Sequence, residues 1–369
     1  AGARGEEGQP VRATRVPASA PTPLRWEDAV GEASAGLIIA GEGASSRARL
    51  WSQASGFPLL SEPASGAWAG GGVTPYEQSI VAGTLGRDVD TVVVTGRPTL
   101  SRPIHALLAR PDVRVVVVDQ HTPWTDISGN ASTVVADLAP PTRPCGAAAA
   151  WAARVREACE LAGRRIGDLL AAGSGRTMID LARAVARASD GPLLLGASNP
   201  VRAFDLAVPS LEGRAVHSNR GQAGIDGTIA TSVGVALGSA SSRSADGGGR
   251  VTAVMGDLTL CHDASSLALA AATHSDLDIV LADDNGGGIF ATLEHGAAAS
   301  RDAYDRWFGL AQSVDYAALA TAYGVSFARA DTPEELSSIL ATPALGPRMI
   351  HAPVERAAHL YGAIRDILR

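Results

Sequence analysis

The feature that most constrains this chain is a pair of apolar runs, each followed by an acidic turn. Residues 251–255 lead into Asp257, and residues 277–282 lead into the turn 283–288, which reads DDNGGG. Small residues at helical spacing separate the two runs, which predicts a βαβ unit. Neighbouring parallel strands of an open α/β sheet present their carboxyl ends at one edge, where ligands bind. We therefore expect Asp257 and Asp284 to meet at that edge.

The oxygen-bearing groups of the two acidic turns are typical of a metal site. Carboxylates and backbone carbonyls are hard oxygen ligands, and Mg²⁺ favours such a set when a phosphate group completes its octahedron. The glycines after Asn285 let the backbone approach a ligand closely. In the structural alternative, Asp257 caps the next helix and residues 284–286 form an ordinary turn. Because both turns follow apolar runs at this spacing, we favour the metal site.

Composition excludes several classes of function. The formal net charge of −7 and the pI near 5.6 argue against binding to nucleic acid. No apolar run in the sequence has the length needed to span a membrane. The three cysteines have no metal-binding spacing and suit a reducing compartment, so we expect a cytoplasmic protein. Apart from histidine, every basic residue is arginine, which excludes a catalytic lysine.

The pattern of apolar runs predicts an α/β fold with two doubly wound parallel-sheet domains. We expect residues 1–25 to be a linker or disordered lead, residues 26–145 to form one domain, and residues 146–369 to form the second. Asp226 is expected to cap a helix that begins near Thr228. The expected strands are residues 36–40, 91–95, 113–119, 192–195, 251–255, 277–282 and 349–352. The expected helices are residues 104–109, 147–161, 177–188, 228–237, 316–323 and 355–368.

Two further loops carry arginines after predicted strands. Arg202 lies in the loop that begins at Ser198, and Arg220 lies in the segment 217–227. The planar guanidinium group donates two parallel hydrogen bonds to a carboxylate, so these loops indicate an anionic substrate with several charges. The alternative is surface ion pairing. Arg97 and Arg102 flank another predicted turn, where they either bind an anion or are solvated.

The combined pattern of both acidic turns resembles the signature of the thiamin diphosphate enzymes. That resemblance implies that Asp257, Asp284 and the carbonyl of Gly286 hold Mg²⁺ or Mn²⁺ against the cofactor diphosphate. At two positions the chain departs from the common signature, because Leu258 replaces a glycine and Asp284 replaces an asparagine. The second change adds a negative charge beside the diphosphate. The residues implied in cofactor binding are Ile225, Gly256, Asp257, Leu258, Asp284, Asn285, Gly286 and Ile289.

The segment 218–227, SNRGQAGIDG, resembles more closely the 2-succinyl-5-enolpyruvyl-6-hydroxy-3-cyclohexene-1-carboxylate (SEPHCHC) synthase family of menaquinone biosynthesis. This resemblance implies that Ile225 holds the cofactor in its bent shape. Phe290 and Leu293, with Ile289, would line the pocket near the thiazolium ring. The residues implied in binding the substrate carboxylates are Ser198, Arg202 and Arg220.

The same resemblance implies the reaction and its substrates. A thiamin-dependent transferase would add 2-oxoglutarate, with loss of carbon dioxide, to isochorismate. Members of the family are dimers or tetramers of three-domain subunits, and the first domain binds the pyrimidine ring and carries an activating glutamate. The sequence before Trp26 does not resemble such a domain, so we expect little turnover by this chain alone and assign it no catalytic residue.

Two other interpretations remain open at this stage. The chain could belong to another thiamin-dependent decarboxylase or acetolactate-type ligase, although those enzymes more often have Gly-Asp-Gly and lack the segment 218–227. It could also be a module without catalytic activity that binds an anionic metabolite through Arg97, Arg102, Arg202 or Arg220. Magnesium-dependent binding of thiamin diphosphate separates this second interpretation from an enzyme.

Overall fold

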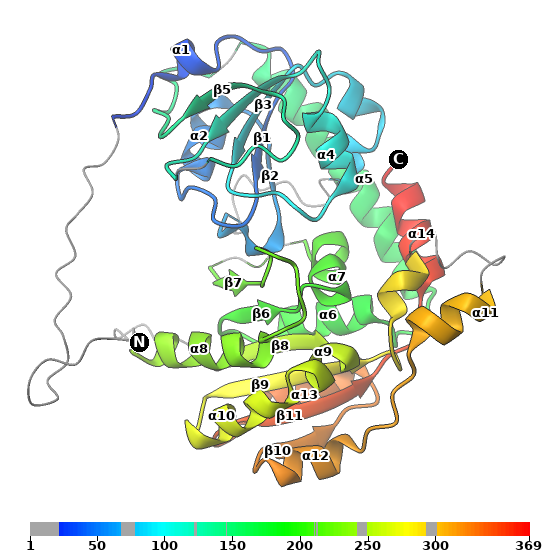
Figure 1. Ribbon diagram of the computed structural model, residues 1–369. Helices are drawn as coiled ribbons and strands as arrows, with labels where there is room; N and C mark the ends of the chain where they lie inside the picture. The colour runs from blue at the N-terminus through cyan, green and yellow to red at the C-terminus, as the bar shows by residue number, and fades with distance from the viewer. Residues whose placement is uncertain are drawn as a thin grey trace, which may run out of the picture.

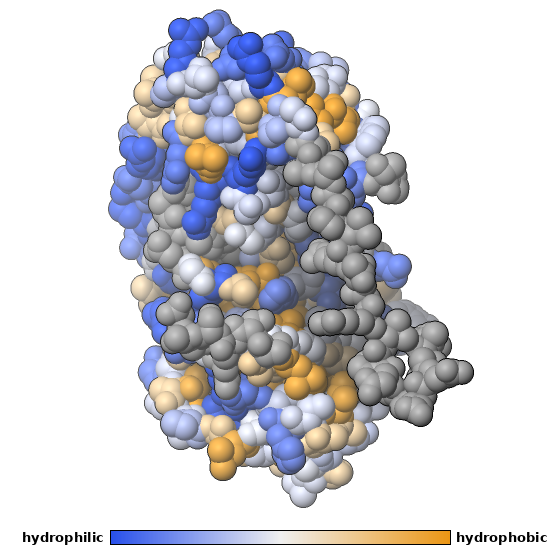
Figure 2. All heavy atoms as spheres, turned by 90° about the vertical axis from the view of Figure 1, so that its left-hand side faces the viewer, coloured by the Kyte–Doolittle hydropathy of each residue, from blue (hydrophilic) through white to orange (hydrophobic). Residues whose placement is uncertain are grey.

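The computed structural model describes residues 22–67, 78–121, 124–144, 146–209, 211, 213–241, 249–292 and 301–369. Within this part of the chain the strands form two sheets, and all strand pairs in both sheets are parallel. One sheet lies above the other in the view of Figure 1, and the molecule is elongated in this direction (Figure 1; Figure 2). The α/β class predicted from the sequence is confirmed.

The first sheet, at the top of Figure 1, has both of its faces buried. Leu37 and Ile39 pack with Ile104 in one apolar cluster, whereas Ile38 packs with Trp51 in another. Because successive strand residues point to opposite faces, this alternation means that apolar groups cover the sheet on both sides. The strands are β1 (Gly36–Ala40), β2 (Leu59–Ser61), β3 (Thr91–Thr95), β4 (Arg114–Val118) and β5 (Ala131–Val135), in the order β2-β1-β3-β4-β5. The helices of this part are α1 (Trp26–Ala29), α2 (Ala48–Ser55), α3 (Gln78–Val81) and α4 (Arg102–Leu108), with 3₁₀ turns η2 (Pro63–Ser65) and η3 (Thr84–Arg87).

The second sheet is also covered on both faces. Ile279 packs with Val233 of α8 on one side, and Val280 packs with Val201 of α7 on the other. Its strands are β6 (Leu193–Leu195), β7 (Val216–His217), β8 (Val251–Gly256), β9 (Leu277–Asp283), β10 (Ser326–Arg329) and β11 (Arg348–Pro353), in the order β10-β11-β9-β8-β6-β7. The helices are α6 (Met178–Ala188), α7 (Asn199–Ala207), α8 (Thr228–Ser241), α9 (Asp257–His262), α10 (Leu267–Ala272), α11 (Arg301–Tyr304), α12 (Tyr316–Ala322), α13 (Pro333–Ala341) and α14 (Ala358–Ile367), with short turns η4 (Ala264–Ser266), η5 (Gly288–Thr292) and η8 (Asp305–Gly309).

A single long helix, α5 (Ala148–Ala171), connects the two sheets (Figure 1). Near its start, Trp151 is buried against the first sheet and its indole N–H donates to the carbonyl of Gly36 at 2.9 Å. Near its end, Ile166 is buried in the core of the second sheet. The helix is longer than the predicted 147–161, and it contributes to both cores.

The chain joins the first sheet earlier than the sequence indicates. Leu24, which the sequence assigns to an unstructured lead, forms a parallel bridge with Leu138. The ordered part therefore begins before Trp26, and the predictions for residues 1–21 lie outside the described residues. Cys145 also lies outside them, whereas Cys159 is buried and Cys261 is half-buried. Among the helices that the structure describes, none is both long and apolar enough to cross a membrane.

The order of strands in the second sheet creates a crevice at one edge. From β6 the chain passes to β7, which pairs with one side of β6, and then crosses to β8, which pairs with its other side. Open α/β sheets bind ligands at such a switch point, beyond the carboxyl ends of the strands. The loops that begin at Gly196 and Gly256 lie at this point.

At the opposite edge of the same sheet, a buried ion pair links β9 and β11. Asp278 is 2% exposed and accepts hydrogen bonds from Nε and Nη2 of Arg348 at 2.8 and 2.9 Å. Arg250 lies 3.0 Å from the same carboxylate. Arg348 therefore depends on Asp278 for charge compensation, whereas Arg250 also pairs with Asp276 at 2.7 Å.

We expect Asp278→Ala to reduce the free energy of unfolding by about 3–5 kcal/mol, because it leaves the guanidinium group of Arg348 buried without a carboxylate. Urea denaturation followed by circular dichroism measures this loss. Asp276→Ala is the matched control, since this half-exposed carboxylate also pairs with Arg250, and such a pair contributes about 1 kcal/mol or less. Equal losses in the two variants would contradict the interpretation.

Candidate functional site

A cavity of about 110 Å³ lies at the switch point between β6 and β8. Its walls come from the segments that follow β6, β8 and β9, together with single residues from α6 and from the loop before α8. Small-molecule sites usually enclose about 300 Å³ or more, so these residues surround only part of a cofactor-sized ligand. The lining residues are Met178, Ser198, Asn199, Pro200, Ile225, Gly256, Asp257, Leu258, Thr259, Ala282, Asp284, Gly286, Gly287, Gly288, Ile289 and Phe290.

Asp257 connects the ends of β8 and β9. It begins α9 and is 1% exposed. Its Oδ1 accepts the N–H of Leu258 at 2.7 Å, and its Oδ2 accepts the N–H of Gly286 at 2.6 Å. The two acidic turns therefore meet at the edge of the sheet, which confirms the placement predicted from the βαβ pattern.

The site concentrates negative charge in a poorly solvated place. Burial raises the pKa of Asp257 to about 7, and the nearby carboxylates of Asp284 and Asp283 add to this rise. Burial also raises the pKa of Asp284 to about 6. Asp283 differs, because a hydrogen bond from His351 at 2.8 Å lowers its pKa. A divalent cation would relieve the mutual repulsion of these carboxylates.

The donor set fits a hard cation. Asp257 and Asp284 offer carboxylate oxygens, and the carbonyl of Gly286 offers a backbone oxygen, which are the ligands that Mg²⁺ prefers. Among the described residues there is no cluster of three or more histidine, cysteine or acidic side chains arranged for a metal. An octahedral Mg²⁺ ion bound to two carboxylates and one carbonyl would keep further coordination positions for oxygens of a bound ligand or water.

The turn after β9 requires its glycines. Asn285 has a φ of 57° and Gly286 a φ of 125°, and the second value strains any other residue. A Cβ on Gly286 would lie 1.8 Å from the carbonyl oxygen of Gly309. A Cβ on Gly287 or Gly288 would meet another atom at 2.0 Å or closer. The turn is thus packed against neighbouring backbone, and its own backbone faces the cavity without side chains in between.

The two arginines predicted to bind substrate converge outside this cavity. Nη1 of Arg202 donates to the carbonyl of Ser198 at 2.8 Å, and burial lowers the pKa of its guanidinium group. Arg220 is 5% exposed, and its Nε and Nη2 donate to Thr99 Oγ1 at 3.1 and 3.0 Å. Both also reach the carbonyl of Ala197, at 3.5 and 3.3 Å. Neither lines the cavity, so their assignment to substrate carboxylates stays a prediction.

Several of the remaining predicted site residues line the cavity. Ser198 lines the cavity, as do the apolar residues Ile225, Ile289 and Phe290. Leu293 lies outside the described residues. Near the other arginine pair, Nη1 of Arg97 lies 3.5 Å from the carbonyl of Gly221.

Known proteins resemble this chain over most of its length. The family model for the thiamine pyrophosphate enzyme C-terminal, TPP-binding domain matches residues 207–352, which include β8, β9 and both acidic turns. A 2-succinyl-5-enolpyruvyl-6-hydroxy-3-cyclohexene-1-carboxylate synthase of Nocardioides is 41% identical over 332 residues, covering 87% of this chain and 61% of the relative. Synthases of the same name from Renibacterium salmoninarum and Rhodococcus erythropolis are 36% and 38% identical, and the matches cover 87% and 89% of this chain.

The chain is a homologue of these SEPHCHC synthases. The relatives are longer proteins, and the matches cover 61%, 57% and 58% of their length. This chain therefore spans about three fifths of the synthases it matches.

In this synthase homologue, the site also uses residues that the sequence did not reveal. Arg356, between β11 and α14, donates from Nε to the carbonyl of Asp284 at 2.7 Å. Asn199 lines the cavity, and its buried Oδ1 has no hydrogen-bond partner among the described residues. Asp263, rather than the predicted Asp226, caps α8, because its Oδ2 accepts the N–H of Ile229 at 2.7 Å. None of these contacts is local in sequence, so no nearby motif indicates them.

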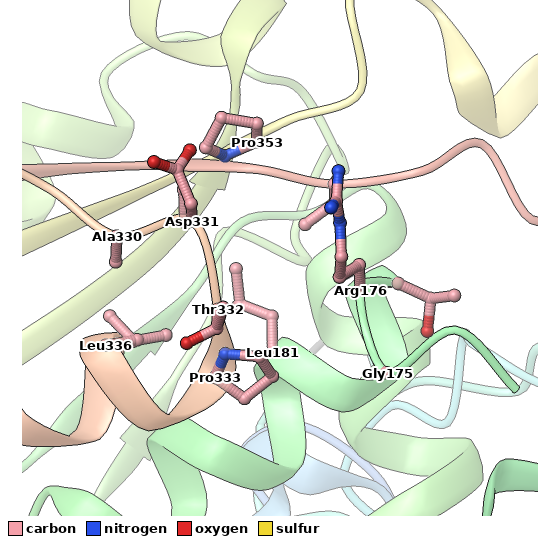
Figure 3. Close-up of a pocket in the computed structure, with 12 residues that line it drawn as sticks. Gly175, Arg176, Leu181, Ala330, Asp331, Thr332, Pro333, Leu336 and Pro353 are labelled. Carbon is pink, nitrogen blue, oxygen red and sulfur yellow. The ribbon is translucent and has the colours of Figure 1, made fainter.

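A second hollow in the synthase homologue does not compete with this cavity (Figure 3). Arg176 comes from the connection before α6, Asp331 comes from the connection between β10 and α13, and Pro333 begins α13; these residues line its wall. The hollow measures about 20 Å³, which suits about one water molecule. It contains none of the residues predicted to bind cofactor or substrate.

A buried carboxylate of the first sheet supports the loop that holds Arg220. Glu62 is 2% exposed, and its Oε1 accepts the N–H of Leu100 at 2.7 Å. The preceding residue, Thr99, accepts the hydrogen bonds of Arg220. Burial raises the pKa of Glu62 to about 8, and the carboxylate of Asp205 adds to this rise.

We expect Glu62→Gln to change the pH dependence of stability. The folded state holds the Glu62 proton more tightly than the unfolded state, so the protein loses stability as pH rises from about 4.5 to about 8. Glutamine does not titrate, so the free energy of unfolding of the variant should rise relative to the parent across this window. Urea denaturation at several pH values measures the difference, with the exposed Glu334→Gln as control. A difference that is constant with pH would contradict the interpretation.

Proposed function

We propose that this chain supplies the cofactor-binding part of a SEPHCHC synthase, which binds thiamin diphosphate with Mg²⁺ or Mn²⁺. The contact between Asp257 and the N–H of Gly286 carries this proposal, because it joins the two acidic turns at the switch point of the sheet. Both turns lie within residues 207–352, which the thiamine pyrophosphate domain model matches. The cavity also has the apolar residues that the resemblance implies, apart from Leu293.

In the proposed site each group has a chemical task. Asp257, Asp284 and the carbonyl of Gly286 would hold the metal ion, and the glycines of the turn would let the diphosphate approach the backbone. Ile225 and Ile289 line the cavity with apolar side chains, which exclude water from the reacting atoms. Phe290 is held against Phe308, with ring centroids 5.4 Å apart. When bound, thiamin diphosphate supplies the electron sink for loss of carbon dioxide from a 2-oxo acid.

The proposed reaction is the decarboxylative addition of 2-oxoglutarate to isochorismate, as in the synthases. Both compounds are dicarboxylates, which suits Arg202 and Arg220 as anion-binding groups. In this structure the two guanidinium groups donate to the carbonyls of Ser198 and Ala197 and to Thr99. Substrate carboxylates would therefore exchange with these contacts. Ser198 accepts a hydrogen bond from Arg202 and also lines the cavity.

We expect the chain to bind thiamin diphosphate in the presence of Mg²⁺ and to lose this binding when a chelator removes the metal. Isothermal titration calorimetry measures both conditions. Asp257→Ala removes a metal ligand, so it should weaken binding by more than about tenfold. Asp366→Asn, a change at an exposed carboxylate near the C-terminus, is the control and should bind like the parent. Unchanged affinity in Asp257→Ala would refute the metal assignment.

The same titration separates the proposed substrate from that of other thiamin enzymes. The chain loaded with Mg²⁺ and thiamin diphosphate should bind 2-oxoglutarate more tightly than pyruvate, because only the first has a second carboxylate for the arginines. Preference for pyruvate would favour an acetolactate-type ligase. Binding of 2-oxoglutarate with no dependence on thiamin diphosphate would favour a module without catalytic activity.

A further inference from the structure

Arg356 makes an unusual set of contacts with the turn after β9. It lies in the connection between β11 and α14, far from the turn in sequence. Its Nε donates to the carbonyl of Asp284 at 2.7 Å, and its Nη2 donates to the carbonyl of Asn285 and to that of Gly309 at 3.2 Å. One guanidinium group therefore joins the turn to the segment that packs over its glycines.

The same two peptide groups are held from their other ends by carboxylates. The N–H of Asn285 donates to Asp283 Oδ1 at 2.9 Å, and the N–H of Gly286 donates to Asp257 Oδ2 at 2.6 Å. In a trans peptide the carbonyl and the N–H point in opposite directions. Arg356 and the two aspartates thus hold both ends of two successive peptide groups, Asp284–Asn285 and Asn285–Gly286.

The turn needs such support because its backbone conformation is unfavourable by itself. Asn285 has a φ of 57°, in the left-handed region that residues with a Cβ rarely adopt, and Gly286 has a φ of 125°. Strained conformations of this kind persist where surrounding contacts fix them. The next peptide group is held as well, because the N–H of Gly287 donates at 2.8 Å to the same carbonyl of Gly309 that Arg356 contacts. The carbonyl of that peptide group belongs to Gly286 and is a proposed metal ligand.

Arg356 also affects the charge of the site. Asp284 stands where the thiamin signature commonly has asparagine, so the chain has one more negative charge beside the anionic diphosphate. Nε of Arg356 lies 2.7 Å from the carbonyl oxygen of Asp284, so its positive charge stands beside this residue. The guanidinium group is exposed on the outer side of the turn, so it adds positive charge without occupying the cavity.

We propose that Arg356 is a positioning residue that fixes the turn 284–286 for the metal and offsets the charge of Asp284. This inference rests on the proposed function, because it concerns binding of the same metal and diphosphate. It assigns a task to the connection between β11 and α14. It also explains how the chain accommodates aspartate in place of asparagine.

A double-mutant cycle tests both parts of the inference. The parent chain, Arg356→Gln, Asp284→Asn and the double variant are titrated with thiamin diphosphate in Mg²⁺. Residues that orient metal ligands typically change affinity by about 10–100-fold, so we expect Arg356→Gln to weaken binding by at least about tenfold. With Asp284→Asn already present, the same substitution should cost at least about threefold less, because the charge to be offset is gone.

Arg329→Gln is the matched control. Arg329 is another exposed arginine, on β10, and it pairs with Asp331 at 2.8 Å instead of with the turn. Its substitution should leave the affinity within about twofold of the parent. A purely structural effect on stability would lower affinity equally in both backgrounds of the cycle, so equal losses would refute the charge offset.

A second measurement examines the turn without cofactor. Hydrogen exchange followed by mass spectrometry should show faster exchange of peptides covering residues 283–290 in Arg356→Gln than in Arg329→Gln. Unchanged exchange together with unchanged affinity would overturn this inference while leaving the proposed function intact. Failure of the parent chain itself to bind thiamin diphosphate would overturn the proposed function and the inference with it.

Discussion

The hydrogen bond from the N–H of Gly286 to Asp257 is the contact on which the site depends. It joins the ends of β8 and β9 and brings the buried carboxylate of Asp257 close to the half-buried carboxylate of Asp284. Burial raises the pKa of Asp257 to about 7, and the neighbouring carboxylates add to this rise, so the arrangement is electrostatically unfavourable without a cation. A fold that keeps such carboxylates together at a sheet edge is suited to a metal ion with an anionic ligand. The switch point between β6 and β8 provides the space for that ligand.

Loops of the first sheet contact Arg220, which is a proposed substrate-binding residue. Oγ1 of Thr99 accepts hydrogen bonds from the guanidinium group of Arg220, and Glu62 accepts the backbone N–H of the next residue, Leu100. The helix α5 is buried in both cores, so the sheets are connected by packing as well as by loop contacts. Arg220 is therefore positioned by residues from both parts of the molecule, and a change in either part should affect its orientation.

The sequence predicts the elements whose signal is local. β1 and β3 match the predicted residues 36–40 and 91–95, because each is a continuous apolar run, and the placement of Asp257 beside the turn follows from the topology of a βαβ unit. The sequence does not predict β2 or β10, since β2 has three residues and β10 is largely exposed. Asp226 is expected to cap α8 because it is adjacent in sequence, whereas the cap is Asp263, which is brought to the start of α8 by the tertiary fold. Arg356 could not be found for the same reason, because its partners are carbonyls distant in sequence.

The central claim is that Asp257, Asp284 and Gly286 form a metal site for thiamin diphosphate. A crystal structure of the chain grown with Mn²⁺ and thiamin diphosphate, measured with anomalous scattering from manganese, tests it most directly. The account predicts one strong anomalous peak bonded to a carboxylate oxygen of Asp257, to Asp284 and to the carbonyl oxygen of Gly286, with diphosphate oxygens completing the coordination. A peak elsewhere, or cofactor bound without manganese at this position, would contradict it.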